Sequence, residues 1–170
     1  MAKKFILLFC IFFIHYHSYA QKGSNYLSIG PSAGFPMNFE EFYKTGFGAG
    51  LRGYFGAGPG ALLINVNVIS FENKFYPYRD LNLTSVKIGY TSRLNPPGLF
   101  GYFDVGITTH SRMGRYIMPG VGFGLGYAIP VRNGGTIDIV PSFNAAFHNN
   151  DEVRRTWIDL HVAYRFAVGR

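Results

Sequence analysis

The sequence has almost no cysteine, little charge and, after its first segment, no long apolar run. Cys10 is the only cysteine among 170 residues, and 15% of the residues are charged, against about a quarter in ordinary domains. No apolar run after residue 20 reaches the length of a membrane-spanning helix. Beyond residue 20 the chain therefore excludes disulfide crosslinks, thiol catalysis and anchoring by a later helix.

Glycine and aromatic residues are abundant instead. The chain contains 22 Gly, 17 Phe and 12 Tyr, and aromatic residues make up 18% of it. This aromatic content excludes intrinsic disorder. So much glycine and so many β-favouring aromatic side chains also weaken helices, which argues against a helical bundle and predicts many short strands.

The first twenty residues have the pattern of an export signal. Two lysines precede an apolar stretch from Phe5 to Ile14, and small residues at Ser18 and Ala20 occupy the positions that signal peptidase reads. We therefore expect residues 1–20 to be a cleaved signal peptide and residues 21–170 to form one exported domain.

Export restricts the partners that a basic chain can meet. Without Lys3 and Lys4, 14 basic residues remain against 9 acidic ones, a net charge of +5. Nucleic acid is excluded as a partner of an exported protein. Basic residues at a membrane rim are instead expected to contact the phosphates of outer-membrane lipid and lipopolysaccharide.

Two-residue alternation between turn clusters runs through the rest of the chain. Leu62, Ile64, Val66 and Val68, for example, share one face of a strand. We predict eight strands, at about 25–35, 45–56, 61–71, 81–92, 99–109, 115–130, 135–147 and 156–168. Short turns rich in Gly, Pro and Asn alternate with longer connections. This alternation is typical of outer-membrane barrels, whose periplasmic turns are short and whose outside loops are long.

Charge placement separates a membrane barrel from a soluble one. A soluble eight-stranded barrel keeps apolar side chains inside, whereas a membrane barrel carries them outside around a polar lumen. The strand cores contain three basic and three acidic residues, each on the less apolar face of its strand: Arg52, Lys87, Arg165, Asp104, Asp138 and Asp159. Sparse, balanced charge is typical of a closed lumen in which ions pair. The predicted fold is all-β, an eight-stranded antiparallel up-and-down transmembrane β-barrel.

One predicted strand has an almost bare face. Gly120, Gly122, Gly124 and Gly126 alternate with large apolar residues. Glycine at such positions makes room for large neighbours inside a narrow barrel. The large side chains expected to fill the interior are Arg52, Tyr54, Lys87, Phe100, Tyr102 and Trp157.

The hairpin centres predict two ion pairs in the lumen, because antiparallel partners have a constant sum of residue numbers. A turn centred on residues 95–96 gives a sum of 191 and sets Lys87 opposite Asp104. A turn centred on residues 151–152 gives a sum of 303 and sets Asp138 opposite Arg165. Both assignments join opposite charges, although charge was not used to make them.

The closing strand carries a resemblance to a known family. Apolar residues alternate from Leu160 onward and end on Tyr164 and Phe166. Together with the exported body and the Gly-rich amphipathic strands, this resembles the small eight-stranded outer-membrane β-barrels of the OmpA-like type in Gram-negative envelopes. The resemblance implies an outer-membrane location, with Tyr164 and Phe166 in the assembly signal that the barrel-assembly machinery reads. That family often ends on the aromatic residue, whereas residues 167–170 follow it here.

Candidate catalytic residues are few. His110 and Ser111 are adjacent and point to opposite faces of a strand, so the histidine is badly placed to activate the serine. His148 and Asp151 have no serine at a matching position. We assign no catalytic residue from the sequence.

A metal or cofactor site is not indicated either. Asp159 and His161 share the lumen face of the last strand, but no third ligand and no metal motif accompany them. We expect His161 to join the lumen hydrogen-bond network of the strand charges.

These observations predict an integral outer-membrane protein with a structural or interaction role, in envelope integrity or adhesion, through its outer loops and without an open pore. Two alternatives stay open. An outer-membrane lipid-modifying enzyme needs a clustered His, Ser and acid at one rim. A secreted soluble lipocalin-like barrel for a small apolar ligand needs an emptied interior with the strand charges outside. The sequence names no extracellular partner.

Overall fold

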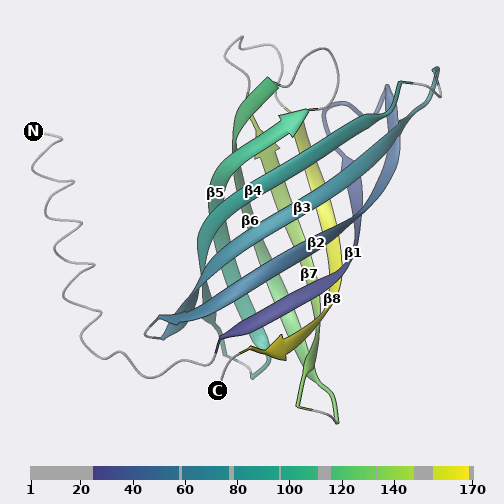
Figure 1. The fold of residues 1–170 in the computed structure, drawn as a ribbon. Helices are drawn as coiled ribbons and strands as arrows, with labels where there is room; N and C mark the ends of the chain where they lie inside the picture. Colours follow the sequence, from purple (N-terminus) through teal and green to yellow (C-terminus); the bar gives the residue numbers. More distant parts are fainter. Residues whose placement is uncertain are drawn as a thin grey trace, which may run out of the picture.

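The chain forms a closed barrel of antiparallel strands, as the computed structural model in Figure 1 shows. The structure describes residues 25–57, 59–76, 79–95, 97–110, 116–132, 134–147 and 155–168, so the expected signal peptide lies outside the described residues. The strands are β1 (Tyr26–Pro36), β2 (Tyr43–Ala57), β3 (Gly60–Asn73), β4 (Leu81–Arg93), β5 (Leu99–His110), β6 (Tyr116–Pro130), β7 (Thr136–Ala146) and β8 (Arg155–Ala167).

Each strand pairs with the next one along the chain, and β8 closes the barrel on β1. The closing ladder runs from Tyr26 opposite Ala167 to Pro36 opposite Trp157. The predicted all-β up-and-down barrel is confirmed, and each strand limit lies within two residues of the expected one. Among the described residues, no helix has the length and apolar character needed to cross a membrane.

The two ends of the barrel differ in their connections. The β2–β3, β4–β5 and β6–β7 connections are short, and they lie at the same end as the start of β1 and the end of β8 (Figure 1). We call this the short-turn end. The other four connections lie at the opposite, long-loop end. Three of them are longer, whereas β5–β6, at residues 111–115, has the same length as β4–β5 and β6–β7.

The outward face of the sheet is apolar. Side chains such as Ile88, Val105 and Phe123 are more than half exposed, at 55%, 53% and 57%. Arg52, Lys87, Asp104, Asp138 and Asp159 are buried instead. This inverted polarity contradicts the soluble lipocalin-like alternative, which requires apolar side chains inside and charges outside.

Side chains fill the lumen in layers. A long-loop plug consists of Phe39, Tyr43, Ile69, Phe71, Leu81, Leu83, Met118, Ala146 and Trp157. A short-turn cluster consists of Tyr54, Leu63, Phe100, Tyr102, Ala128 and Val140. A polar layer with most of the buried charges lies between them. All six large side chains expected inside are buried, as an eight-stranded barrel requires.

The bare face of β6 makes the crowded lumen possible. A Cβ added at Gly122 would collide with the Asp104 carboxylate and would lie 2.9 Å from Lys87 Nζ. A Cβ at Gly126 would collide with the Phe100 ring. The glycine alternation therefore does what the sequence predicted: it leaves room for ions and rings from neighbouring strands.

Candidate functional site

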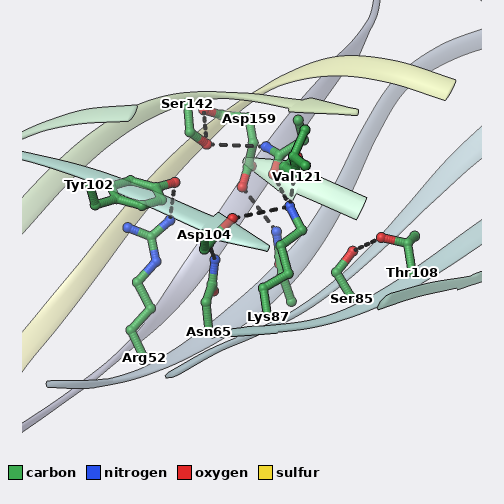
Figure 2. Close-up of polar contacts among 12 residues, drawn as sticks. Arg52, Asn65, Ser85, Lys87, Tyr102, Asp104, Thr108, Val121, Ser142 and Asp159 are labelled. Atoms are coloured by element: carbon green, nitrogen blue, oxygen red, sulfur yellow. Dashed lines mark hydrogen bonds and ion pairs between the residues drawn. The ribbon is translucent and has the colours of Figure 1, made fainter. Parts of the chain in front are cut away.

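The polar layer is centred on Lys87, which β4 places in the middle of the lumen (Figure 2). Its Nζ lies 3.5 Å from Asp104 Oδ1 and donates hydrogen bonds to Asn144 Oδ1 at 2.6 Å and to the Val121 carbonyl at 3.3 Å. Asn65 Nδ2 donates to Asp104 Oδ2 at 2.8 Å. Both ions are thus paired and hydrogen-bonded, as buried charges require.

A second set of polar contacts lies beside the first. Asn67 Nδ2 donates to Asp159 Oδ2 at 2.9 Å, and Ser32 Oγ donates to Asn67 Oδ1 at 3.2 Å. Arg52 Nη2 donates to Tyr102 Oη at 3.3 Å, and the guanidinium carbon lies 4.9 Å from the centroid of that ring. Arg52 is therefore held by an aromatic side chain of the short-turn cluster (Figure 2).

A third set of contacts lies at the short-turn end of the lumen. Arg165 Nη2 lies 3.3 Å from Asp138 Oδ1, and Arg165 Nε donates to Thr136 Oγ1 at 3.0 Å. The rings of Tyr26, Tyr54 and Phe100 surround the guanidinium carbon at 5.7, 5.3 and 5.6 Å. The Arg165 side chain is 20% exposed, so this pair is less enclosed than the Lys87 pair.

Both predicted ion pairs are present, but the predicted registers are wrong. Lys87 is directly opposite Gly106, and Asp138 is directly opposite Ala163, so each pair is a diagonal contact. The residue numbers of directly opposed partners add up to 193 in the β4–β5 hairpin, where 191 was predicted. They add up to 301 in the β7–β8 hairpin, where 303 was predicted. A shift of two residues keeps every side chain on its face, and long side chains still reach across the diagonal.

The remaining predicted residue of the network, His161, is buried on β8 beside the polar layer. Its Nε2 makes no hydrogen bond within the described ranges, and Ser32 Oγ is engaged with Asn67. Histidine and serine are therefore not linked as base and nucleophile here. In the same ranges, no group of three or more His, Cys, Asp or Glu side chains is arranged to hold a metal ion.

The residues considered for catalysis at the long-loop rim are mostly not described. His110 ends β5, whereas Ser111, His148 and Asp151 lie outside the described residues.

The sequence analysis missed the amide side chains that complete the network. Asn65, Asn67 and Asn144 each contact a buried ionised group. Asn65 and Asn67 alternate with the outward residues of β3 and so lie on the lumen face. That alternation was a usable signal: a polar pair on the face opposite an apolar stripe belongs to a polar lumen.

A loop residue, Phe39, closes the long-loop end and was also missed. It lies between β1 and β2 and is 2% exposed. Its ring meets those of Tyr43 and Phe71 edge-on, with centroids 5.8 and 5.3 Å away. Arg155 covers it, with its guanidinium carbon 5.3 Å from the ring centroid. The long-loop end is therefore closed by apolar packing that Arg155 covers.

The β1–β2 and β3–β4 connections expose other large apolar side chains. Met37, Phe42, Phe75 and Tyr76 are 46%, 54%, 65% and 48% exposed. The Lys74 amide donates to the Phe42 carbonyl at 2.9 Å and so joins the two loops. Asn73 Oδ1 accepts hydrogen bonds from the amides of Phe75 and Tyr76, both at 2.9 Å. These contacts fix the backbone at Lys74, Phe75 and Tyr76.

The predicted assembly-signal residues lie on the outward side of β8. Tyr164 is 42% exposed, and its ring stacks on that of Phe166 with centroids 6.0 Å apart. Their role in assembly stays a prediction.

Comparisons with known proteins agree with this architecture. No family model matches the chain, and no curated protein matches it. Among solved structures, Ail, the attachment invasion locus protein of Yersinia pestis, has a TM-score of 0.58 at 18% identity and covers 86% of this chain and 100% of its own. Neisserial surface protein A has a TM-score of 0.56 at 14% identity, covering 86% and 98%.

A third structure is the N-terminal β-barrel domain of Pseudomonas aeruginosa OprF, with a TM-score of 0.54 at 16% identity, covering 85% of this chain and 99% of that one. At sequence identities this low, the similarity shows a shared fold and carries no information about activity. The chain therefore has the fold of the small eight-stranded outer-membrane β-barrels.

Proposed function

We propose that this chain is an integral protein of the outer membrane of a Gram-negative cell, with a structural or interaction role in envelope integrity or adhesion. The observation that carries the proposal is the inverted polarity of the barrel, with apolar side chains outside and balanced ions inside. Outer-membrane lipid and lipopolysaccharide are the proposed surroundings of the apolar face. The barrel-assembly machinery is the proposed reader of Tyr164 and Phe166.

The long loops are the proposed working surface. The outward side chains change from Val68 to Ser70 and Glu72 along β3, so the apolar face ends below the loop that follows. Phe75 and Tyr76 therefore lie beyond the apolar face, where lipid does not explain their exposure. Exposed aromatic side chains are typical of protein-recognition surfaces. Ail, which shares this fold, is described as an attachment invasion locus protein.

A complementation experiment tests the loop proposal. In a strain of the native host lacking the gene, we expect wild type to restore attachment and detergent resistance, and Phe75→Ser combined with Tyr76→Ser to lose at least one of them. Phe55→Ser is the matched control, because Phe55 is a 42% exposed aromatic residue toward the short-turn end of β2. Full restoration by the loop double variant, with equal surface amounts, would show that these loops are not the working surface.

The barrel is not proposed as a pore, because Lys87, Trp157 and the other buried side chains fill its cross-section. In planar lipid bilayers we expect no stable, large single-channel conductance from the folded protein. Sustained large openings at low voltage, absent from a boiled sample, would contradict the closed lumen.

A further inference from the structure

A cavity of about 860 Å³ opens at the short-turn end of the barrel. Its inner wall includes Tyr26, Tyr54 and Phe100, and its rim includes Leu94 and Leu99 on either side of the β4–β5 turn. Pockets for small molecules span about 300–1,000 Å³. The residues of the Lys87 network do not line this cavity, so it is distinct from the polar layer.

The cavity is positively charged. Arg93 and Arg165 both line it. Arg93 is exposed and makes no ion pair within the described residues, whereas Arg165 is paired with Asp138. Among the residues that the structure describes, every exposed Asp or Glu lies at the long-loop end. Arg132, in the β6–β7 turn, is also exposed at this end, so the cations exceed the acids around this mouth.

Each arginine of the cavity lies beside apolar groups: Arg165 among aromatic rings, and Arg93 next to Leu94 in the sequence. Arg165 lies inward among three aromatic rings, where its Nε and Nη2 contact Thr136 and Asp138. Leu94 is 42% exposed at the rim. A small hydrated anion would contact the guanidinium groups and leave the leucines and rings without a partner.

We propose that this cavity binds an amphiphile with an anionic headgroup and an apolar chain. The guanidinium groups of Arg165 and Arg93 bind the phosphate or carboxylate, since arginine presents paired donors that match these groups. Leu94 and Leu99 contact the chain. The molecule comes either from the adjacent lipid leaflet or from solution, because both supply this chemistry. The site lies opposite the long loops, so its test is independent of the loop experiment.

Calorimetric titration of octyl phosphate into the processed protein in phosphatidylcholine nanodiscs tests the proposal. We expect saturable binding with one site per barrel, and much weaker binding of inorganic phosphate and of neutral octyl glucoside. No saturable heat, or inorganic phosphate binding as tightly as octyl phosphate, would overturn the amphiphile site.

Two variants with matched controls locate the site. Arg93→Gln is expected to weaken octyl phosphate binding at least about fivefold, because it removes a charged donor, whereas Arg79→Gln, at the exposed arginine of the long-loop end, leaves it unchanged. Ala61→Phe, which fills the cavity, is expected to abolish binding, whereas Ala49→Phe on the outward face is not. If Arg93→Gln and Arg79→Gln changed octyl phosphate binding equally, or if Ala61→Phe and Ala49→Phe did, the assignment of the site would be overturned. If Ala61→Phe does not fold, the comparison of Arg93→Gln with Arg79→Gln decides.

A change of lipid distinguishes the two sources. If phosphatidylglycerol in the nanodiscs competes with octyl phosphate on the wild type, the bilayer supplies the ligand. If affinity is the same in both lipids, the ligand comes from solution. Each result supports the site and names its source.

Discussion

The lumen and the outward face of this barrel place the same kind of ion pair in opposite surroundings. Lys87 and Asp104 meet in the lumen with side chains 1% and 0% exposed. Lys44 and Glu72 meet on the outside, beyond the apolar face, 2.9 Å apart and 53% and 55% exposed. The N–O distance is shorter in the outer pair. The inner pair nevertheless matters more to folding, because burial removes each inner ion from bulk water.

The lumen pair gives the largest expected effect. Lys87→Met leaves the Asp104 carboxylate buried with Asn65 as its hydrogen-bond donor. We expect the free energy of unfolding to fall by about 3–5 kcal/mol, the cost of stranding one ion of a buried pair. Urea unfolding of the protein refolded in lipid vesicles measures this loss.

A double-mutant cycle sharpens the same prediction. Lys87→Met combined with Asp104→Leu is expected to cost less than the two single losses together, because neither ion is then stranded. The double variant does not recover wild-type stability, since Asn65 and Asn144 each lose a partner. Additive losses would reject an ionic coupling between the two residues.

The outward apolar face gives the next largest effect. Val105 is adjacent to Asp104 in sequence but points out of the barrel and is 53% exposed. Val105→Lys places an ammonium group against lipid and is expected to cost about 2–4 kcal/mol. Val105→Leu is the control and is expected to be nearly neutral. A lysine tolerated here without loss of stability would mean that this face meets water.

The outer ion pair gives the smallest effect. Lys44→Ala removes the contact with Glu72, and we expect a loss of no more than about 1 kcal/mol, decreasing further as salt is added. The comparison with Lys87→Met would fail if the two substitutions proved equally costly in the same unfolding assay.

The sequence predicted the faces of the strands better than their register. Lys87 and Asp104 were assigned to the lumen from alternation, which depends only on whether a position is odd or even. Their exact opposition depended on the centre of the β4–β5 turn, where Gly98 has a φ of 90°. A turn centre displaced by one residue changes the register sum by two. This explains why both ion pairs formed although both registers were wrong.

Loop contacts were beyond a pattern-based analysis. Phe39 has no periodic neighbours that mark it as buried, because its environment comes from β2, β3 and Arg155. The cavity at the short-turn end is likewise formed by residues far apart in sequence, such as Tyr26, Arg93 and Arg165. Alternation assigns residues to faces, but it does not locate the space that remains between them.

The measurement that tests the account most directly is membrane fractionation of cells producing the full chain. An apolar outward face predicts that the processed protein stays with outer membranes after a carbonate wash. A closed barrel predicts that its migration on gels changes on heating, because the folded form resists detergent until boiled. Release of the protein into the soluble fraction, with migration that heating does not change, would contradict a transmembrane barrel.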